Sequence, residues 1–516
     1  MHLRQMLEET VDQYGEKDAI VINDRRISYS ELDKASNKIA NTLIKLGVNK
    51  GDRVAFLLSN SPEFVITYFG TVKIGAIAVP LDIKYKADDL TPLLNNALPK
   101  ILVIESVDQE PLLPVLSGFK SIDHIIDIDS RYEERYLSYQ EIIAEGSEQP
   151  IEIELDSDDI ANINYTSGSS FNPKGVMLSH HSLVSEAVIS ANGFQQTYRD
   201  KMMLYALPMH HVLGLAVALL GSIYTGSTVV MVPGTGLSIS SFMAAIERER
   251  GTIFVGVPFI FAIAADMAER EGIKSDLSSL RLCICAGAPL SIDIMERFKK
   301  QFGFNILDCW GLTEAVCHVT CPSLNGNGRS GSVGKALPGW EVKIIGNDGK
   351  ELLPNQSGEM VVRGPITNGY YNNQSATAAV IKNGWLHSGD VGKADEEGNL
   401  YITGRLKDTI IVKGQNISPG DIEAVLIKNP KVAEVAVIGI WDELRGEVIG
   451  AIISLKEGEV ATEHEIKQFC LERIVSYKAP KQVFFMESLP RTATGQIDKE
   501  SIRNQLSIPF AFPPVK

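Results

Sequence analysis

A run of hydroxyl and glycine residues between Tyr165 and Gly175 has the composition of a phosphate-binding loop. Four of its side chains can donate hydroxyl hydrogen bonds to phosphate oxygens, namely Thr166, Ser167, Ser169 and Ser170. Gly168 lets backbone N–H groups approach an anion, and Lys174 adds a positive charge. The loop predicts binding of a polyphosphate, and an ordinary surface turn is the alternative interpretation.

Two better-known phosphate motifs do not fit the chain. A Walker A loop needs Gly before its Lys and Ser or Thr after it, whereas Pro173 and Gly175 occupy those places. The run from Gly326 to Gly331 matches the letters of a dinucleotide fingerprint, but neither a strand before it nor a helix after it is predicted. We therefore exclude both classes.

The segments around the loop alternate between strand and helix patterns. An apolar strand at 160–164 precedes the loop, and a helix begins near Ser179. Upstream, Ser28 and Glu31 form a capping box for a helix over 28–46, and a strand, a helix capped by Ser61 and a second strand follow as a βαβ unit. This alternation predicts an α/β fold with sheets covered by helices.

The pattern changes towards the C-terminus. Short strands separated by Gly-containing turns predict a small β subdomain at about 334–406. After it, strands and helices predict a compact α+β unit. We expect a large N-terminal domain at 1–406 and a small C-terminal domain at 407–516.

Composition excludes several classes of function. A net charge of -15 over 516 residues disfavours binding to nucleic acid, which needs a basic face. The apolar run from Val212 to Tyr224 is too short to cross a bilayer and fits a buried helix. The first residues lack a signal-peptide core, so a cytoplasmic location is expected. Cys317, His318 and Cys321 could begin a zinc site, but no second ligand pair completes it.

Four further motifs follow the loop in a fixed order. They are Leu207-Pro208-Met209-His210-His211-Val212-Leu213-Gly214, Trp310-Gly311-Leu312-Thr313-Glu314, Trp385-Leu386-His387-Ser388-Gly389-Asp390 and Gly404-Arg405-Leu406-Lys407-Asp408. With the loop, they resemble the adenylate-forming superfamily of acyl-CoA synthetases, luciferases and peptide-synthetase adenylation domains. The resemblance covers nearly all of the chain and is closest to fatty-acid or aryl-acid CoA ligases.

The resemblance implies a set of nucleotide contacts in the large domain. Glu314 would hold Mg²⁺, Thr313 would contact the α-phosphate, and Trp310 would lie along the adenine, roles that suit a carboxylate, a hydroxyl and an indole. Asp390 would accept hydrogen bonds from the ribose hydroxyls, with Arg405 supporting the sugar. The remaining implied nucleotide-binding residues are Ser167, Gly168, Ser169, Ser170, Gly287, Ala288, Pro289, Asp308 and Cys309.

The resemblance also implies residues that contact the acid, residues that line the channel for the thiol, and a hinge for the small domain. His211 would stand next to the acid, in a pair with His210 that could otherwise be core packing. Lys407 would be the hinge of a mobile C-terminal domain, and Lys413 and Gly414 would approach the channel for coenzyme A. An apolar lining is expected from Val257, Phe259, Ala286, Leu312, Val316 and Val319, with Cys309 narrowing the tunnel.

The implied reaction is attack of a carboxylate on ATP to give acyl-AMP and pyrophosphate, followed by transfer to a thiol. The carboxylate is already anionic, so the protein positions it and neutralises charge with Mg²⁺, Lys174 and hydroxyl donors such as Thr166. The family usually has Lys where Gln496 stands, and Gly where Phe171 stands. Gln496 brings no charge to the transition state, which predicts slower adenylation by about 2 to 4 kcal/mol.

The sequence restricts the class of the acid substrate and of its thiol acceptor but does not identify either one. No Asp lies between Lys201 and Ala265 to pair a substrate ammonium, so we expect a fatty or aryl acid without an α-amino group. Coenzyme A is the expected acceptor, and a separate acyl carrier protein is the alternative. A second alternative is a weakly active or trapped nucleotide-binding variant, because of Gln496. The oligomeric state is left open between a monomer and a homodimer.

Overall fold

The computed structural model describes most of the chain. The described residues are 1–106, 112–116, 118–131, 136–166, 173–232, 238–288, 290, 292–325, 328–346, 348–406, 410–412, 415–417, 419–442, 444–490 and 497–506. At 113, 114, 403–405, 416 and 500 only the backbone is described. In this part of the chain no helix is both long and apolar enough to cross a membrane.

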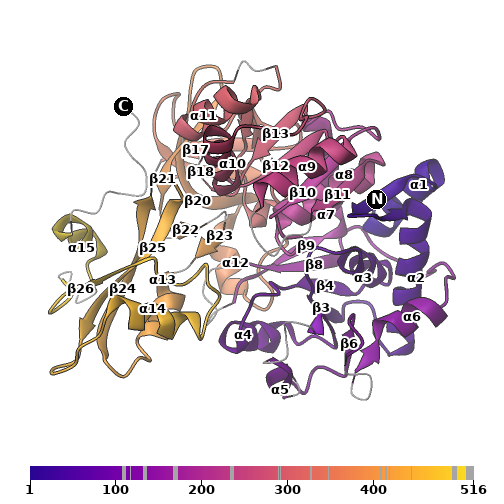
Figure 1. Ribbon diagram of the computed structural model, residues 1–516, viewed down its shortest axis with the longest axis horizontal. Helices are drawn as coiled ribbons and strands as arrows, with labels where there is room; N and C mark the ends of the chain where they lie inside the picture. Colours follow the sequence, from indigo (N-terminus) through magenta and orange to yellow (C-terminus); the bar gives the residue numbers. More distant parts are fainter. Residues whose placement is uncertain are drawn as a thin grey trace.

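Two seven-stranded sheets form the larger part of the molecule (Figure 1). The first has the order β14-β13-β12-β10-β11-β1-β2, and its strands are β1 (Asp18–Ile22), β2 (Arg25–Ser28), β10 (Lys201–Tyr205), β11 (Thr228–Val232), β12 (Ile253–Gly256), β13 (Leu282–Cys285) and β14 (Ile306–Asp308). Its neighbours pair in parallel except β1 with β2. Near-continuous burial of β11, β12, β13 and β14 is what a parallel sheet covered on both faces requires.

The second sheet has the order β7-β6-β5-β3-β4-β8-β9. Its strands are β3 (Arg53–Leu57), β4 (Ile77–Pro80), β5 (Ile101–Ile104), β6 (His124–Asp127), β7 (Leu137–Ser138), β8 (Ile160–Tyr165) and β9 (Gly175–Ser179). All of its neighbours are parallel except β8 and β9. The loop from Tyr165 to Gly175 therefore joins β8 to the antiparallel strand β9, and the helix expected near Ser179 follows β9 at His180–Gly193 with Ser179 as its N-cap.

Helices surround these sheets. They are α1 (Leu3–Tyr14), α2 (Tyr29–Lys45), α3 (Pro62–Lys73), α4 (Ala87–Ala97), α5 (Leu113–Leu116), α6 (Tyr139–Glu145), α7 (His180–Gly193), α8 (Gly221–Thr225), α9 (Ile239–Glu249), α10 (Pro258–Glu271) and α11 (Ile292–Phe302), with a π-helix η3 (Leu213–Leu220) and a 3₁₀ turn η4 (Thr313–Ala315). The predicted capping box of Ser28 and Glu31 starts α2, and Ser61 caps α3. The apolar run after His211 is buried helix, as predicted, but its part from Leu213 to Leu220 is wound as a π-helix.

A β subdomain and a smaller C-terminal unit complete the chain, as the sequence predicted. The subdomain contains β16 (Lys335–Ala336), which pairs with β15 (Thr320–Cys321), and a sheet of β17 (Glu341–Ile345), β18 (Gly358–Arg363), β19 (Ile381–Lys382), β20 (Trp385–Ala394) and β21 (Leu400–Arg405), with α12 (Gln374–Val380). The C-terminal unit contains β22 (Ile410–Val412), β23 (Gln415–Ile417), β24 (Val432–Asp442), β25 (Gly446–Leu455), β26 (Gln482–Phe485), α13 (Pro419–Leu426), α14 (Glu463–Leu471) and α15 (Lys499–Gln505). This unit, drawn in orange to yellow, lies at one end of the molecule beside α4 (Figure 1).

Candidate active site

The carboxyl ends of three parallel strands meet at one edge of the first sheet. The register pairs Gly256 of β12 with Cys285 of β13, and Cys285 with Asp308 of β14. The loops that follow these strands therefore lie next to one another, which is where open α/β sheets place their ligands. This edge is the floor of the candidate site.

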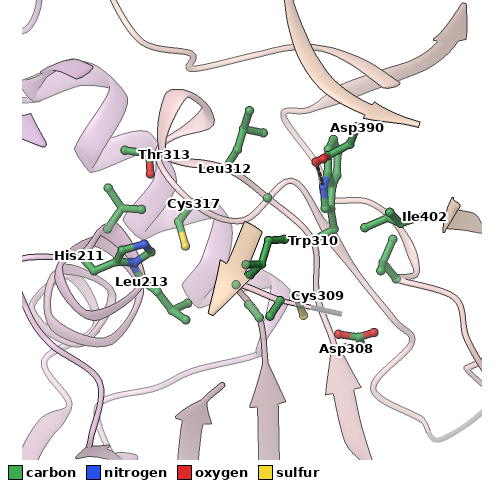
Figure 2. Close-up of a pocket in the computed structure, with 17 residues that line it drawn as sticks. His211, Leu213, Asp308, Cys309, Trp310, Leu312, Thr313, Cys317, Asp390 and Ile402 are labelled. Carbon is green, nitrogen blue, oxygen red and sulfur yellow. Dashed lines mark hydrogen bonds between the residues drawn. The ribbon is translucent and has the colours of Figure 1, made fainter. Parts of the chain in front are cut away.

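A cavity lies above this edge (Figure 2). Its lining residues come from five segments: His211, Val212 and Leu213 after β10; Ala286, Gly287 and Ala288 after β13; Asp308 to Thr313 with Cys317 around η4; Val333, Asp390 and Ile402 from the β subdomain; and Ile411 of β22. The site is therefore shared between the large domain and the C-terminal unit.

One side of the cavity is polar and built around an indole–carboxylate pair. Trp310 Nε1 donates a hydrogen bond of 2.8 Å to Asp390 Oδ2, and both side chains are buried (Figure 2). The backbone of Asp390 pairs with that of Arg405 across β20 and β21. The two residues expected at the ribose are thus adjacent on one sheet, with Trp310 fixing the carboxylate.

Asp308 and Cys309 close the floor of this polar side. Burial raises the pKa of Asp308 well above its usual range, so its carboxyl is favoured in the neutral form. Cys309 donates its backbone N–H to the Cys285 carbonyl at 2.8 Å, and its buried thiol lies against that of Cys321. All six cysteines are free and buried.

Glu314 lies in a second polar cluster beside the cavity. Its Oε1 accepts a 2.7 Å hydrogen bond from the hydroxyl of Tyr370. Lys174 Nζ stands 5.3 Å from the centre of the Tyr370 ring, within the range of a cation–π interaction. Lys174 therefore contacts Tyr370, which in turn bonds Glu314. Burial, reinforced by the adjacent Glu314 carboxylate, raises the pKa of Tyr370, which keeps its hydroxyl a donor.

The opposite side of the cavity is apolar and carries His211. Leu213, Leu312 and Cys317 line it (Figure 2). The His211 Nδ1 accepts a hydrogen bond from the backbone N–H of Leu213 at 3.3 Å, and burial lowers the pKa of His211 to about 4. A neutral ring whose Nδ1 is an acceptor carries its proton on Nε2, so His211 presents a donor there.

A second, narrower cavity adjoins the first and lies between the two domains. It is lined by Tyr85, Asn164, Tyr165, Thr166, His210, His211, Val212, Thr313, Gln415 and Tyr477. His211 and Thr313 belong to both cavities, so the second leads to the same centre. Gln415 directly follows the Lys413 and Gly414 positions expected at a thiol channel.

Buried charges hold the two domains together next to this second cavity. Lys478 Nζ lies 3.5 Å from Asp89 Oδ1 and 3.8 Å from Asp421 Oδ2, and all three side chains are at most 5% exposed. Asp89 also accepts a 3.3 Å hydrogen bond from the Val475 backbone N–H. The C-terminal unit therefore contacts α4 through Asp89.

Several residues predicted for the site are brought together, and others are not. Those that line one or both cavities are Thr166, His211, Ala286, Gly287, Ala288, Asp308, Cys309, Trp310, Leu312, Thr313 and Asp390. Val257 and Val316 are buried but line neither cavity, so their place in an acyl pocket stays a prediction. Ser167, Gly168, Ser169, Ser170, Phe171, Pro289, Lys407, Lys413, Gly414 and Gln496 lie outside the described residues, and Arg405 is described by its backbone only.

The turn after Glu314 explains why Val316 is not in the lining. Val316 has a φ of +59°, a conformation that β-branched residues rarely adopt. A side chain at Gly311 would collide with the backbone carbonyl of Cys317, so glycine is required there. The chain folds back on itself at this turn, and Cys317 rather than Val316 reaches the cavity.

Sequence reasoning missed Tyr370 and Asn164, and it left His210 as core packing. Asn164 Nδ2 donates to the His210 carbonyl at 2.8 Å, and Asn60 bonds the Leu207 carbonyl and the Met209 N–H at 2.8 Å each. Two consecutive polar positions of one face, Asn162 and Asn164 in a buried strand, were the only local signal.

Comparison with known proteins agrees with the geometry of the site. The family model described as "AMP-binding enzyme" matches residues 7–371, and that described as "AMP-binding enzyme C-terminal domain" matches 421–496. The chain is 33% identical to the long-chain-fatty-acid–CoA ligase FadD13 of Mycobacterium tuberculosis, with 94% of each chain covered. It is 33% identical to an indoleacetate–CoA ligase of Aromatoleum aromaticum, covering 96% of this chain and 97% of the other.

A solved structure of a CoA ligase has a fold similar to that of this chain. The anthranilate CoA ligase AuaEII, in complex with anthranoyl-AMP, has a TM-score of 0.75 and 29% identity to this chain, covering 98% of this chain and 97% of its own. Its mixed α/β architecture agrees with the large domain of parallel sheets and the small C-terminal domain described above. The chain belongs to the AMP-binding enzyme family of the adenylate-forming superfamily and is an AMP-forming acid–thiol ligase.

Proposed function

We propose that the protein activates a fatty acid with ATP and Mg²⁺ to acyl-AMP and transfers the acyl group to coenzyme A in the cytoplasm. The observation that carries this proposal is the two-sided first cavity. Asp308, Trp310 and Asp390 form its polar side, and Leu213, Leu312 and Cys317 form its apolar side. A nucleotide suits the first side and an acyl chain the second.

The polar side fits an adenosine. Asp308 in its neutral form can donate to or accept from a base edge, and Trp310 provides an aromatic surface. Asp390 is oriented by the Trp310 indole and would accept from ribose hydroxyls. Thr313 stands where both cavities meet, so its hydroxyl would contact the α-phosphate.

Glu314 suits a Mg²⁺ site in which the protein supplies few of the ligands. No group of three or more His, Cys, Asp or Glu side chains in the described part of the chain is placed to hold a metal. Mg²⁺ characteristically binds one or two carboxylates together with substrate phosphates and water. Tyr370 bonds one oxygen of Glu314 and leaves carboxylate capacity for the ion, which would neutralise phosphate charge.

The residues near the reacting atoms would position charge rather than move protons in the first step. The acid is already ionised, so no base is needed. His211 carries its proton on Nε2 and would donate to an oxygen of the acid or of the acyl-AMP. Lys174 would offset the repulsion between the carboxylate and the phosphates.

The thiol is proposed to arrive through the second cavity. This cavity lies between the domains, reaches His211 and Thr313, and contains Gln415 beside the expected channel residues. A separate acyl carrier protein would present the same thiol chemistry and is the alternative acceptor. The protein could act as a monomer or a homodimer in either case.

The experiment measures acid-dependent release of pyrophosphate with a panel of fatty and aryl acids, with and without CoA. We expect release to depend on a fatty acid and CoA to raise turnover. The Gln496→Lys variant restores a cation and should raise acyl-AMP formation by about 100-fold. Acyl-AMP formation without stimulation by CoA would favour the carrier-protein acceptor, and no acyl-AMP from either protein would contradict the proposal.

A further inference from the structure

The second half of the proposed reaction, on which this inference rests, requires a thiol to lose its proton. The thiolate is the nucleophile, and a thiol with a pKa of about 8.5 is only a few per cent ionised at pH 7. A proton acceptor in the thiol's path would therefore accelerate the step. We searched for one among the described residues that line the second cavity.

Three tyrosines in that lining are poor candidates. Burial is the largest cause of a raised pKa for Tyr85, Tyr165 and Tyr477, so their hydroxyls remain protonated. The amide and hydroxyl side chains of the lining, Asn164, Gln415, Thr166 and Thr313, do not titrate near neutral pH. Apart from the apolar Val212, His210 and His211 are the remaining described groups in the lining.

The two histidines differ in which ring nitrogen is available. His211 Nδ1 is occupied by the Leu213 N–H, so its Nε2 carries a proton and can only donate. No described residue forms a hydrogen bond with the His210 ring. His210 Nε2 instead faces Asp82, with 3.8 Å between Nε2 and Oδ2. A carboxylate favours the proton on the nitrogen that faces it, which leaves Nδ1 of His210 as an acceptor.

Asp82 is fixed so that it can perform this role. It lies after β4, its carboxyl is buried, and its Oδ1 accepts a 2.9 Å hydrogen bond from the Lys84 N–H. The neighbouring charge of Asp82 also contributes to raising the pKa of Tyr477 in the C-terminal unit, so the two groups lie near each other. The charge of Asp82 is therefore held at the domain boundary, next to His210.

The groups around His210 keep it unprotonated at neutral pH. Burial lowers the pKa of His210 below its usual value, the Asp82 charge opposes this shift, and Lys84 reinforces it. His211 is the other titratable group on the same loop. Two further titratable groups face His210, namely Tyr85 in the segment before α4 and Tyr477 of the C-terminal unit. Lys478 stands 5.6 Å from the Tyr85 ring centre, in contact with Asp89 and Asp421. The loop itself is clamped by Asn60 and Asn164.

We propose that His210 is the catalytic residue that takes the proton of the incoming thiol, and that Asp82 is its positioning residue. The S–H bond breaks and its proton moves to His210 Nδ1, while the sulfur electron pair forms a bond with the acyl carbon. The bond between that carbon and the AMP oxygen breaks, and AMP leaves with the electron pair. The imidazolium then faces the Asp82 carboxylate until the proton passes to water.

The test follows the second step alone and starts from chemically prepared acyl-AMP of an acid that releases pyrophosphate in the assay above. CoA is mixed with the enzyme and acyl-AMP, and thioester formation is followed by rapid quench between about pH 6 and pH 8. The wild-type rate should change little above pH 7, because burial lowers the pKa of His210 below its usual value and the ring is then neutral. His210→Gln should be slower by about 100-fold at pH 7.

The pH profile separates a lost base from damaged structure. The rate of His210→Gln should rise about tenfold per pH unit, because only preformed thiolate reacts. Asp82→Asn should lower the plateau and move the acid limb of the profile to lower pH, because the ring loses the charge that stabilises its protonated form. His181→Gln, a change at an exposed histidine on α7, should match the wild type.

Two outcomes overturn the inference. An unchanged rate in His210→Gln would exclude a proton-accepting role, and so would a decrease of the same size at every pH. Failure of the wild-type protein to form any thioester from acyl-AMP would instead contradict the proposed acceptor, and the inference with it. Because the intermediate is supplied, a variant that adenylates poorly is still tested.

Discussion

The indole of Trp310 and the carboxylate of Asp390, 80 residues apart in sequence, are joined by a buried hydrogen bond of 2.8 Å. The bond links the turn after β14 to β20 of the β subdomain, so the wall and floor of the nucleotide side are fixed to each other. Ser388 adds to this by accepting the Asp390 N–H at 3.0 Å. The orientation of the proposed ribose acceptor thus depends on a residue that would also contact the base.

Replacing Trp310 with Phe should weaken ATP use while leaving an aromatic ring in the cavity. The variant loses the donor to Asp390 and leaves a buried carboxylate oxygen without it, at a cost of about 1 to 3 kcal/mol. We expect kcat/KM for ATP in pyrophosphate release to fall by about 5- to 100-fold. Trp385→Phe, at a tryptophan that stacks on Arg363, is the control and should retain activity. Equal values for Trp310→Phe and wild type would show that the bond does not position the nucleotide.

Removing the Tyr370 hydroxyl should affect the dependence on Mg²⁺. Tyr370→Phe eliminates the 2.7 Å bond to Glu314 and lets the carboxylate turn away from the phosphates. A neutral-to-charged hydrogen bond is worth about 1.5 to 3 kcal/mol, so saturation should need at least about tenfold more Mg²⁺. Pyrophosphate release measured against Mg²⁺ concentration gives this value. Tyr371→Phe changes the neighbouring ring, and a similar shift there would argue against a specific effect on Glu314.

A buried acid behind the cavity should make folding stability depend on pH. Burial raises the pKa of Glu186 to about 8, although its Oε1 accepts 2.8 Å hydrogen bonds from the His318 N–H and the Ser190 hydroxyl. The unfolded chain releases this proton near pH 4.5, whereas the folded chain holds it to about pH 8. Glu186 therefore contributes stability at low pH that is lost as pH rises between these values, at about 1.4 kcal/mol per unit.

Glu186→Gln keeps the acceptor and removes the titration. The slope of the unfolding free energy against pH between pH 5 and pH 7.5, from urea denaturation, should be less negative by about that amount than in wild type. Glu457→Gln, at an exposed glutamate, serves as the reference and should leave the slope unchanged. A slope that is identical in Glu186→Gln and wild type would mean that Glu186 is ionised in the folded protein.

Loss of the Lys478 charge should impair closure of the C-terminal unit. Lys478→Met leaves Asp89 and Asp421 buried without their cation, a situation that costs about 3 to 5 kcal/mol in the closed arrangement. Because the second cavity exists only when the units meet, thioester formation should slow by at least about tenfold, and acyl-AMP formation should slow less. Rapid quench of each step measures both rates. Lys481→Met, at an exposed lysine nearby, is the comparison, and parallel losses in both steps would contradict a role in closure.

Local features of the fold could be predicted from the sequence because their causes are local. The capping box of Ser28 with Glu31 and the cap at Ser61 start helices within one residue of the expected positions. Strand β9 was not predicted, since its partner β8 lies across the loop and only pairing identifies it as a strand. The π-helical winding after His211 likewise has no signature in an apolar run.

The site was predicted where motifs mark it and missed where distant segments complete it. Trp310, Thr313 and Asp390 stand in recognisable motifs, and all three line the cavity. Tyr370 reaches Glu314 from 56 residues away, and Asp82 reaches His210 across the junction of two loops, so no spacing pattern indicates either contact. The backbone φ of +59° at Val316 likewise has no sequence signature, and the place of this residue in an acyl pocket stays a prediction.

The contact between α4 and the C-terminal unit has a consequence for how often it can be broken. Its described contacts include the ion pair of Asp89 with Lys478 and the hydrogen bond from the Val475 N–H to Asp89, which join groups that water solvates well when they separate. The proposed movement of the C-terminal domain would separate these polar groups in each turnover, and their separation would not expose an apolar surface to other proteins. A contact of this polar kind suits an interface that forms and separates repeatedly better than one that stays permanently closed.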